Sequence, residues 1–447
     1  MYGRCRLNFK NKNILVYGLG KSGMACIKHL TRSSANLFIY DNDKKLMRNY
    51  KKNGVHLFSD DMLTDIDIII KSPGVDPNES ILQKAREQNK LVISEVEFAF
   101  LKQKSKNIIA ITGTNGKTTV TELITDMLEN ENKCFKCGNI GYAFSNYIDQ
   151  IQANDYVILE VSSFQLEDID KFTPKVCVIT NLAPDHLDRY SDVQDYYDAK
   201  FKIFKNQKEH DFLIVGEDVI DKINGQTIKA QLYHYGENNN KSGTFLKGKD
   251  VYFRNLSGEE NFVCKMDDKH FSNVNNLKNL LCAICVCCVL QKTSNIENIV
   301  KEFNYIEHRY ERIGKVKGVE FVNDSKATNI HATLNAVKNI KTTVHLLLGG
   351  SDKGENFNIL FQNMPQNVKA YLFGSTANKM VYSAIKTNFK HFKICHNMRH
   401  ALQVAFKEAK RGEMVLLSPA CASFDEFKNF EERGKYFKEW VYALNDK

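Results

Sequence analysis

The chain has 447 residues, of which 43% are hydrophobic and 26% charged. This composition is typical of a globular protein and excludes a disordered one, and because single cores rarely exceed about 300 residues we expect three domains. The formal net charge of +9 is scattered, without a basic helix interleaved with aromatics, which argues against nucleic-acid binding and suits small anionic substrates.

No segment reads as an export signal or a membrane span. The N-terminus "MYGRCRLNFKNKN" lacks an apolar core, and the longest apolar stretch, residues 279–290, is too short to cross a bilayer. We therefore expect a cytoplasmic protein whose 12 cysteines are reduced and buried. The lone CxxC at Cys134 and Cys137 and the cysteine cluster at 282–288 lack a second pair at zinc-site spacing, so no metal or redox role is predicted for them.

Residues 13–93 alternate short apolar strands, such as "NILVYG" and "DIIIKS", with helical stretches. This rhythm predicts a parallel sheet. The first strand runs into "GLGKSG", where Gly18, Gly20 and Gly23 fit the G-x-G-x-x-G turn, and Asp41 ends the next strand at the spacing of a ribose-binding acid. By these rules alone the loop would bind NAD, although the pattern by itself is weakly specific.

A second series of strands runs from "NIIAITG" through "DYVILEVSS", "KVCVITNLAPDH" and "DFLIVGED", with a β-alternating patch at 241–264. In "GTNGKTT" a strand precedes the loop and a helix follows it, which predicts a nucleoside triphosphate site. Lys117 would neutralise the β- and γ-phosphates, and Thr118 would bind Mg²⁺. One departure is that Ile111 stands where the general pattern has its first glycine, which here is Gly113.

Metal-ligand types follow two strands of this second series. Glu160 ends "DYVILE", and Asp185, His186 and Asp188 follow "VCVITNLAP". Carboxyl ends of parallel strands meet at one edge of a sheet, where ligands bind. Each residue alone could be a solvent-facing carboxylate or a turn histidine, but together behind a GKT loop they indicate a metal centre.

A third series begins near residue 305 and includes "VEFVNDSKATN", "VHLLLGGSDKG", "AYLFGS" and "MVLLSPACAS". We predict an α/β protein of three domains, each with a mostly parallel sheet. The predicted domains are 1–97, 98–304 and 305–447. Because no Pro/Ser/Gly-rich linker separates them, these boundaries depend on the strand rhythm alone.

Nine motifs between residues 112 and 434 together resemble the Mur ligase family. They are "TGTNGKTT", "GNIG", "LEVSSFQLE", "TNLAPDHLDRY", "YDAKFKIF", "HRYERI", "NDSKATN", "LLLGGSDKG" and "SPACASFDEFKNFEERG". "NDSKATN" and the last motif resemble the members that add D-glutamate to UDP-N-acetylmuramoyl-L-alanine. The resemblance implies an ATP-dependent ligase of peptidoglycan precursor synthesis, with a Rossmann-like UDP-substrate domain, a P-loop ATP domain and a Rossmann-like acceptor domain.

The resemblance also implies that "GLGKSG" holds the uridine diphosphate end of the sugar substrate instead of NAD. Both kinds of nucleotide present a diphosphate and ribose hydroxyls, so one loop geometry can serve either. The UDP-substrate residues implied by the family are Gly18, Gly20, Ser22, Gly23, Asp41, Asn42, Ser72, Pro73, Gly74, Asn139, Ser162 and Gln165.

For catalysis, the resemblance implies two Mg²⁺ ions and an acyl phosphate made with the γ-phosphoryl group of ATP. Thr118 and Glu160 would bind the first ion, and His186 and Lys200 the second, with Lys200 carbamylated; from its sequence alone Lys200 could equally be a solvated helix lysine. Lys117 would offset charge on the transferring phosphoryl group. The implied ATP-binding residues are Gly113, Thr114, Asn115, Gly116, Lys117, Thr118, Thr119, Asn276, Asn279, Arg309 and Asp324.

The D-glutamate contacts implied by the family are Lys326, Thr328, Lys353, Ser423 and Phe430. One stretch departs from the family pattern G-x-H-N-x-x-N, because "NVNNLKN" has Asn273 for the glycine and Asn275 for the histidine. Three alternatives stay open: a folylpolyglutamate synthase-like ligase, a Mur ligase with another amino-acid acceptor, and an NAD-binding regulator. We expect a monomer.

Overall fold

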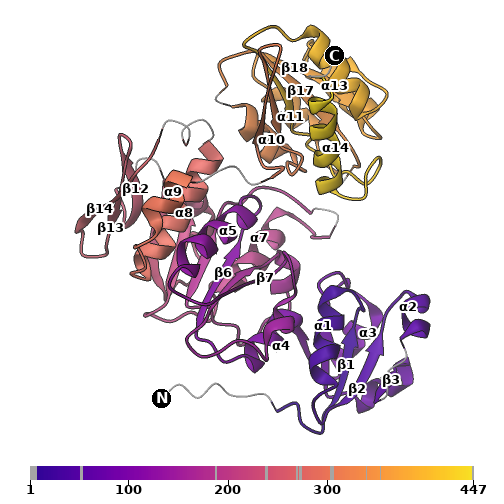
Figure 1. Cartoon of the computed structure of the whole chain (residues 1–447). Helices are drawn as coiled ribbons and strands as arrows, with labels where there is room; N and C mark the ends of the chain where they lie inside the picture. Colours follow the sequence, from indigo (N-terminus) through magenta and orange to yellow (C-terminus); the bar gives the residue numbers. More distant parts are fainter. Residues whose placement is uncertain are drawn as a thin grey trace. The chain divides into compact units, whose positions relative to one another are not determined.

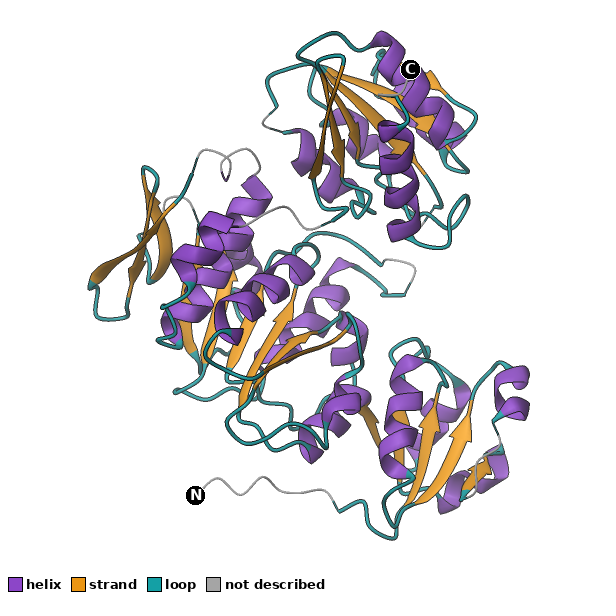
Figure 2. Cartoon of the chain, viewed as in Figure 1, coloured by secondary structure: helices purple, strands orange, loops and turns teal. Residues whose placement is uncertain are grey.

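The computed structural model describes residues 8–50, 54–186, 189–236, 240–267, 270, 274–302, 307–338, 340–352 and 354–444, without the side chains of residues 48 and 49. The chain divides into two compact units, Met1–Leu182 with Asp192–Met266 and Lys278–Lys301, and Ala183–Ser191 with Asp267–Leu277 and Glu302–Lys447. The described residues form three mostly parallel sheets with helices between the strands, as Figures 1 and 2 show. The α/β class predicted from the sequence is confirmed, and the domain boundaries at 97 and 304 stay predictions.

The first sheet has the strand order β3-β2-β1-β4-β5, with all neighbours parallel. The order in which the chain adds strands reverses between β1 and β4, although the strands stay parallel, and such a switch point opens a crevice at the carboxyl ends of the strands. The strands are β1 Asn13–Tyr17, β2 Asn36–Tyr40, β3 Val55–Leu57, β4 Ile68–Lys71 and β5 Leu91–Ser94, and the helices are α1 Lys21–Leu30, α2 Lys44–Asn49, α3 Ser80–Glu87 and α4 Glu95–Lys102.

The second sheet has the order β14-β13-β12-β11-β10-β9-β6-β8-β7. Its strands from β7 to β12 are parallel, and β12, β13 and β14 form an antiparallel extension where the alternating patch was predicted. Its strands are β6 Asn107–Thr112, β7 Cys134–Gly138, β8 Tyr156–Glu160, β9 Val176–Ile179, β10 Phe212–Gly216, β11 Gln231–Tyr235, β12 Gly243–Lys247, β13 Asp250–Arg254 and β14 Glu260–Lys265. The helices of this region are α5 Lys117–Glu129, α6 Ser163–Leu166, α7 Val193–Phe201, α8 Val274–Val289 and α9 Ile296–Glu302.

The third sheet has the order β15-β16-β20-β17-β18-β19, and β15 is its one antiparallel strand among the described residues. The strands are β15 Glu311–Val316, β16 Val319–Asn323, β17 Val344–Gly349, β18 Val368–Phe373, β19 Phe392–Ile394 and β20 Met414–Leu417. The helices are α10 Ile330–Val337, α11 Phe357–Gln362, α12 Ala377–Lys386, α13 Met398–Glu408 and α14 Phe430–Tyr442.

The central strands of the third sheet are apolar on both faces, because helices cover both. Along β17, Leu346 and Leu348 pack into the core beneath α10, α11 and α12, whereas Leu347 packs into the core beneath α13 and α14. Side chains alternate across a strand, so a strand with helices on both faces reads as one continuous hydrophobic run. "VHLLLG" and "MVLL" have this pattern, and for that reason the sequence predicts their sheet well.

No described helix is long and apolar enough to span a membrane. The eleven described cysteines are free thiols, and most are buried, as expected. Burial raises the pKa of the Cys282, Cys285 and Cys287 thiols in α8 well above its ordinary value. These thiols are therefore protonated, and the cluster packs as small apolar side chains.

One buried side chain in the second sheet makes stability depend on pH. His234 in β11 is 5% exposed, and neither of its ring nitrogens has a hydrogen-bond partner among the described residues. Burial, helped by the positive charge of Lys241, lowers its pKa from 6.5 to about 4. Folding therefore favours the neutral ring, and this stabilisation is complete above pH 6.5 and lost as the pH falls toward 4.

Because His234 is buried and neutral, we expect the free energy of unfolding to decrease by about 2 kcal/mol when the pH falls from 7.5 to 5. His234→Leu should remove that part of the pH dependence, as measured by urea unfolding at both pH values. His210→Leu, at an exposed histidine, is the control and should leave the wild-type pH dependence unchanged. If His234→Leu and wild type lose the same stability, the buried imidazole is not the cause.

Candidate functional site

The loop between β6 and α5 has the tight backbone that its glycines require. Gly113 has φ of +139° and Gly116 φ of +82°, conformations that side chains disfavour. A Cβ atom at Gly113 would lie 2.0 Å from the Oγ1 of Thr180, and one at Gly116 would lie 2.5 Å from the Oδ1 of Asn279. Since α5 begins at Lys117, the amides of its first turn lack helical acceptors and can bind an anion.

Two lysines converge on this loop. Lys117 Nζ donates to the carbonyl oxygens of Gly113 and Thr114 at 2.8 and 2.9 Å, and Lys200 Nζ donates to that of Gly113 at 2.9 Å. Lys200 is 2% exposed, and its ammonium lies 4.5 Å from the ring centre of Tyr196, one helical turn earlier. Lys200 is therefore a buried residue of the loop's surroundings and not a solvated helix lysine.

Glu160, the last residue of β8, faces the same loop from the neighbouring strand. Its Oε2 accepts a hydrogen bond from Thr118 Oγ1 at 2.7 Å, and its Oε1 accepts one from Asn139 Nδ2 at 2.9 Å. The carboxylate is 1% exposed. A hydroxyl and a carboxylate at this spacing supply the hard oxygen ligands that Mg²⁺ prefers.

The loop is braced by the end of β9. Thr180 Oγ1 and Asn181 Nδ2 donate to the carbonyl oxygen of Asn115 at 2.5 and 2.9 Å, while Asn181 Oδ1 accepts from the Asn115 amide at 2.9 Å.

Asn276 and Asn279 are both 8% exposed at the start of α8, and Thr119 is buried in α5. Sequence reasoning did not single out Thr180, Asn181 or Tyr196. The i, i+4 spacing of Tyr196 and Lys200 was an available signal.

His186 belongs to the second unit. It has φ of +56°, and its amide donates to Asp185 Oδ1 at 2.9 Å. Asp185 Oδ2 in turn accepts from Asn329 Nδ2 at 3.4 Å, which ties this segment to the start of α10. Asp188 lies outside the described residues, and the role of His186 as a ligand stays a prediction.

The N-terminal glycine loop closes against β4. Ser72 Oγ donates to the carbonyl oxygen of Gly18 at 2.8 Å, and a Cβ atom at Gly23 would lie 1.9 Å from that same oxygen. Asp41 Oδ2 accepts from the Leu19 amide at 2.6 Å. Three of the predicted UDP-substrate segments thus meet at the switch point of the first sheet.

The remaining predicted UDP-substrate residues lie near these segments or follow β7 and β8. Gly20 and Gly74 are exposed and Ser22 and Pro73 half-buried. Asn42 accepts a hydrogen bond from the Tyr17 hydroxyl at 3.2 Å. Ser162 and Gln165 form a reciprocal cap at the start of α6, which gives them a structural role as well; their substrate contacts stay predictions.

On the second unit, Asp324 follows β16 at the carboxyl edge of the third sheet. Its oxygens accept from the Tyr310 amide at 3.1 Å and the Ser418 hydroxyl at 2.9 Å. Burial raises the pKa of Asp324 to about 7, although the neighbouring Arg309 opposes the shift. Arg309 and Asp324 thus interact electrostatically, and their contacts with ATP stay predictions.

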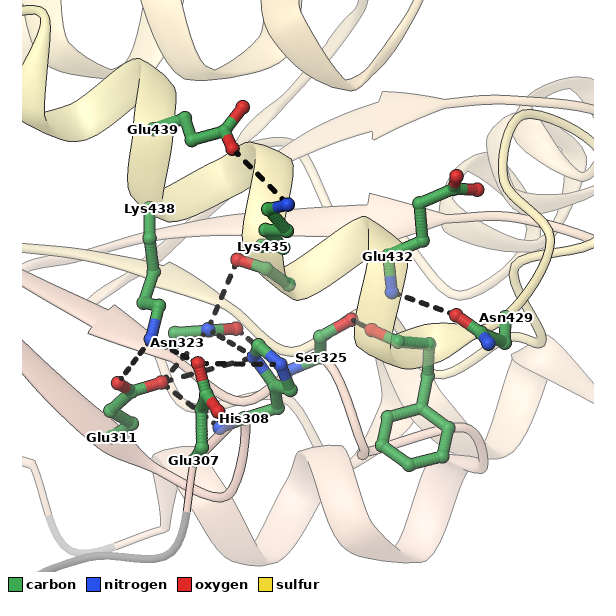
Figure 3. A network of polar contacts seen from close by, with 12 residues as sticks. Glu307, His308, Glu311, Asn323, Ser325, Asn429, Glu432, Lys435, Lys438 and Glu439 are labelled. Carbon is green, nitrogen blue, oxygen red and sulfur yellow. Dashed lines mark hydrogen bonds and ion pairs between the residues drawn. The ribbon is translucent and has the colours of Figure 1, made fainter.

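The segment that carries Arg309 is fixed by a polar network around the buried His308 (Figure 3). Asn323 Nδ2 lies 2.9 Å from His308 Nδ1 and donates to Glu311 Oε2 at 3.1 Å. Lys438 of α14 pairs with both Glu307 and Glu311. A Cβ atom at Gly434 would lie 2.3 Å from His308 Nδ1, so α14 packs here only because it carries a glycine.

Among the described residues, one group offers three potential metal-ligand atoms within 4.8 Å of one another. It consists of Glu307, His308 and Glu311. The Lys438 ammonium already compensates both carboxylates, so this group fits an ion-pair network better than a cation site.

Two of the predicted acceptor residues, Lys326 and Phe430, lie together at the start of α14. Lys326 Nζ lies 3.8 Å from the ring centre of Phe430, and the Phe430 carbonyl oxygen accepts from Ser325 Oγ at 2.8 Å. Thr328 is half-buried and Ser423 buried. Lys353 lies outside the described residues.

Sequence reasoning missed Arg433, which organises this region. Its guanidinium is buried and donates to Ser325 Oγ and to the carbonyl oxygens of Ser325, Cys421 and Ala422 at 2.8 to 3.1 Å. Burial lowers the pKa of Arg433 to about 10, so the side chain stays charged at neutral pH. No sequence pattern distinguishes it from the exposed charges of "NFEERG".

Family models match three successive parts of the chain. "Mur ligase MurD-like, N-terminal domain" matches residues 12–94, "Mur ligase middle domain" residues 111–287, and "Mur ligase, glutamate ligase domain" residues 308–421. Among curated relatives, the UDP-N-acetylmuramoylalanine--D-glutamate ligase of Caldicellulosiruptor saccharolyticus is 35% identical, covering 97% of this chain and 99% of its own. The ligase of the same name from Koribacter versatilis is 36% identical, with 98% and 99% covered.

Solved structures share the fold at low identity. The MurF ligase of Thermotoga maritima in complex with ADP has a TM-score of 0.58 and 16% identity, covering 98% of this chain and 95% of its own. E. coli FolC in complex with ADP has a TM-score of 0.53 and 16% identity, covering 79% and 93%.

Lys117→Ala should weaken binding of a nucleoside triphosphate with Mg²⁺ by about 10- to 100-fold, because a charge-assisted hydrogen bond contributes about 1.5 to 3 kcal/mol. Titration calorimetry measures the loss. Lys136→Ala, which removes a half-exposed lysine of β7 paired with Glu122, is the matched control and should bind as wild type does. Unchanged affinity in a folded Lys117→Ala protein contradicts the phosphate-loop assignment.

Proposed function

The chain belongs to the Mur ligase family, and we propose that it is the ligase that joins D-glutamate to UDP-N-acetylmuramoyl-L-alanine, with ATP hydrolysed to ADP and phosphate. The observation that carries the proposal is the identity of 35 to 36% to D-glutamate ligases along essentially their whole length. The glycine loop with Lys117, Thr118, Glu160 and Lys200 around it supplies the chemistry that such a reaction needs.

The N-terminal sheet separates this proposal from the alternatives. A folylpolyglutamate synthase-like ligase lacks a uridine-binding domain, whereas residues 12–94 match the N-terminal domain of MurD-like ligases. The same match argues against an NAD-binding regulator. A different amino-acid acceptor is disfavoured by the names of the relatives and is tested directly below. A cytoplasmic, monomeric enzyme of peptidoglycan precursor synthesis is part of the proposal.

The reaction needs an activated carboxyl group, because a carboxylate is a poor electrophile. A carboxylate oxygen of the alanine end attacks the γ-phosphorus of ATP, and the bond to the ADP oxygen breaks, which gives an acyl phosphate. The neutral amine of D-glutamate then attacks the carbonyl carbon, the bond from that carbon to the phosphate oxygen breaks, and the nitrogen loses a proton, which leaves with the phosphate. Lys117 at the loop would offset the charge that spreads over the transferring phosphoryl oxygens.

The loop's surroundings fit a magnesium ion. Thr118 Oγ1 and Glu160 Oε2 lie 2.7 Å apart, and both are hard oxygen donors beside the phosphate-binding turn. Thr118 and Glu160 would hold a first ion, which would neutralise phosphate charge when bound. His186 and Lys200 would hold a second one.

A neutral or positive Lys200 cannot fill that role, so we propose that it is carbamylated by CO₂. The amine nitrogen would form a bond to the carbon of CO₂ and lose a proton, which turns a charge of +1 into −1. The burial of Lys200 beside Lys117 supports the proposal, because a carbamate there would attract the neighbouring ammonium instead of repelling it. The Gly113 carbonyl, to which Lys200 donates, is a neutral acceptor.

The acceptor site would use the cations at the start of α14. Lys326 over Phe430, together with Lys353, would face the two carboxylates of D-glutamate. Arg433 would hold the backbone of both Ser325 and residues 421–422 in place. Arg309 and Asp324 would hold the phosphate and ribose of ATP.

The test of the function is phosphate release from ATP by the purified protein with UDP-N-acetylmuramoyl-L-alanine and a panel of amino acids. We expect release to require both the sugar nucleotide and D-glutamate. L-Glutamate, L-alanine and meso-diaminopimelate serve as competing acceptors. Equal use of any of these, or release without the sugar nucleotide, refutes the proposal.

Lys200→Ala should be nearly inactive, and a short carboxylic acid in the buffer should partly restore turnover by supplying the missing anionic oxygens. Lys200→Arg, which keeps the positive charge but cannot react with CO₂, should stay inactive. Lys202→Arg, at the neighbouring lysine that donates to the Glu167 carbonyl, is the control and should keep activity. Turnover by Lys200→Arg would exclude the carbamate.

A further inference from the structure

A buried ion triad joins the first and second sheets beside two of the predicted substrate segments. Lys71, the last residue of β4, is fully buried, and its Nζ lies 2.7 Å from Glu167 Oε2 and 2.9 Å from Asp168 Oδ2. The two carboxylate side chains are 10 and 11% exposed. All three residues belong to the first compact unit.

Each end of the triad continues directly into a segment that would contact substrate. Lys71 precedes Ser72, whose hydroxyl closes the glycine loop by donating to Gly18. Glu167 follows the capped turn formed by Ser162 and Gln165, next to the strand end that carries Glu160. The triad therefore links the proposed UDP loop, through Ser72 next to Lys71, to the proposed reaction site, through the capped turn that ends two residues before Glu167.

The surrounding contacts leave the triad little freedom. The Asp168 carbonyl accepts from the Ser94 amide at 2.8 Å, and its Oδ1 pairs with Arg86 at 3.1 Å. The Glu167 carbonyl accepts from Lys202 at 2.6 Å. Lys71 and Arg86 thus pair with the adjacent carboxylates of Glu167 and Asp168, while Lys202 holds the Glu167 backbone.

We propose that Lys71 is a positioning residue that holds the UDP-binding loop at a fixed place relative to the ligation site, so that one substrate can reach both. This inference rests on the proposed function. A ligand that contacts two segments gains affinity from both only if the distance between the segments matches the length of the ligand. A rigid link between the segments avoids the entropic cost of adjusting that distance on binding. The buried contacts of Glu97 in α4 with the amides of 170–172 lie further along the chain from both segments.

A positioning role for Lys71 predicts different effects on a short ligand, which contacts one segment, and on a long ligand, which contacts both. UDP alone should need only the first sheet, whereas UDP-N-acetylmuramoyl-L-alanine should also engage the segments after β7 and β8. Loss of Lys71 should therefore weaken the long ligand and spare the short one. A lysine that merely supports the fold would weaken both ligands or neither.

The experiment measures binding of UDP and of UDP-N-acetylmuramoyl-L-alanine by calorimetry without ATP. We expect Lys71→Met to reduce the advantage of the long ligand over UDP at least tenfold, with UDP affinity within twofold of wild type. Because a lone Met leaves two buried carboxylates facing each other, Lys71→Met with Glu167→Gln and Asp168→Asn is measured as well and should lose the same advantage. Lys12→Met, at an exposed Lys12–Asp67 pair of the same sheet, is the matched control and should bind both ligands normally.

If the folded triple variant keeps the full advantage of the long ligand, or if both ligands weaken equally, the positioning role is wrong. Wild type is measured first. Failure of the wild-type protein to bind UDP-N-acetylmuramoyl-L-alanine would refute the proposed function itself. Normal wild-type binding with normal variants would refute only the role of Lys71.

Discussion

The carbonyl oxygen of Gly113 accepts hydrogen bonds from both Lys117 and Lys200, and the candidate site depends on this shared contact. Two ammonium groups that meet at one oxygen repel each other. An anion bound in the turn, or a carbamate in place of one ammonium, would remove this repulsion. The proposed phosphate and carbamate would each bring negative charge to the point where these two cations meet.

The sheets place this contact through the ends of three neighbouring strands. β6 runs into the loop, β8 ends at Glu160 and β9 ends before Thr180, and the order β9-β6-β8 sets the loop between the other two. Parallel register brings their carboxyl ends to one edge, so side chains that lie 40 to 90 positions apart in the chain become neighbours without any long connection. The first sheet repeats this logic at β1 and β4, where Ser72 closes on Gly18.

Features that a local pattern can encode were predictable from the sequence. Strand rhythm predicts all three sheets, the GKT junction predicts the loop with Thr118, and the strand end in "DYVILE" predicts Glu160. The burial of Arg433 and Lys71 was not predictable. A sequence does not distinguish a buried charged residue from an exposed one, because the partners that compensate a buried charge lie far away along the chain. Tyr196 lay within reach of sequence analysis, because helical spacing alone sets it against Lys200. His186 illustrates a further limit, since strand rhythm assigns it to the central series while its segment packs with the second unit.

The N-terminal loop shows why a fingerprint defines a shape and not a ligand. Gly18, Gly20 and Gly23 fit the dinucleotide pattern, and the structure explains the spacing by close packing: the oxygen of Gly18 fills the place of a Cβ at Gly23. Asp41, which the fingerprint assigns to a ribose, already accepts from the Leu19 amide and so stabilises the turn itself. The same acid would be needed whether the turn held a dinucleotide or a UDP-sugar. The two kinds of ligand differ in where the part beyond the diphosphate must bind. In this chain Lys71 joins the loop to the segment that follows Glu160.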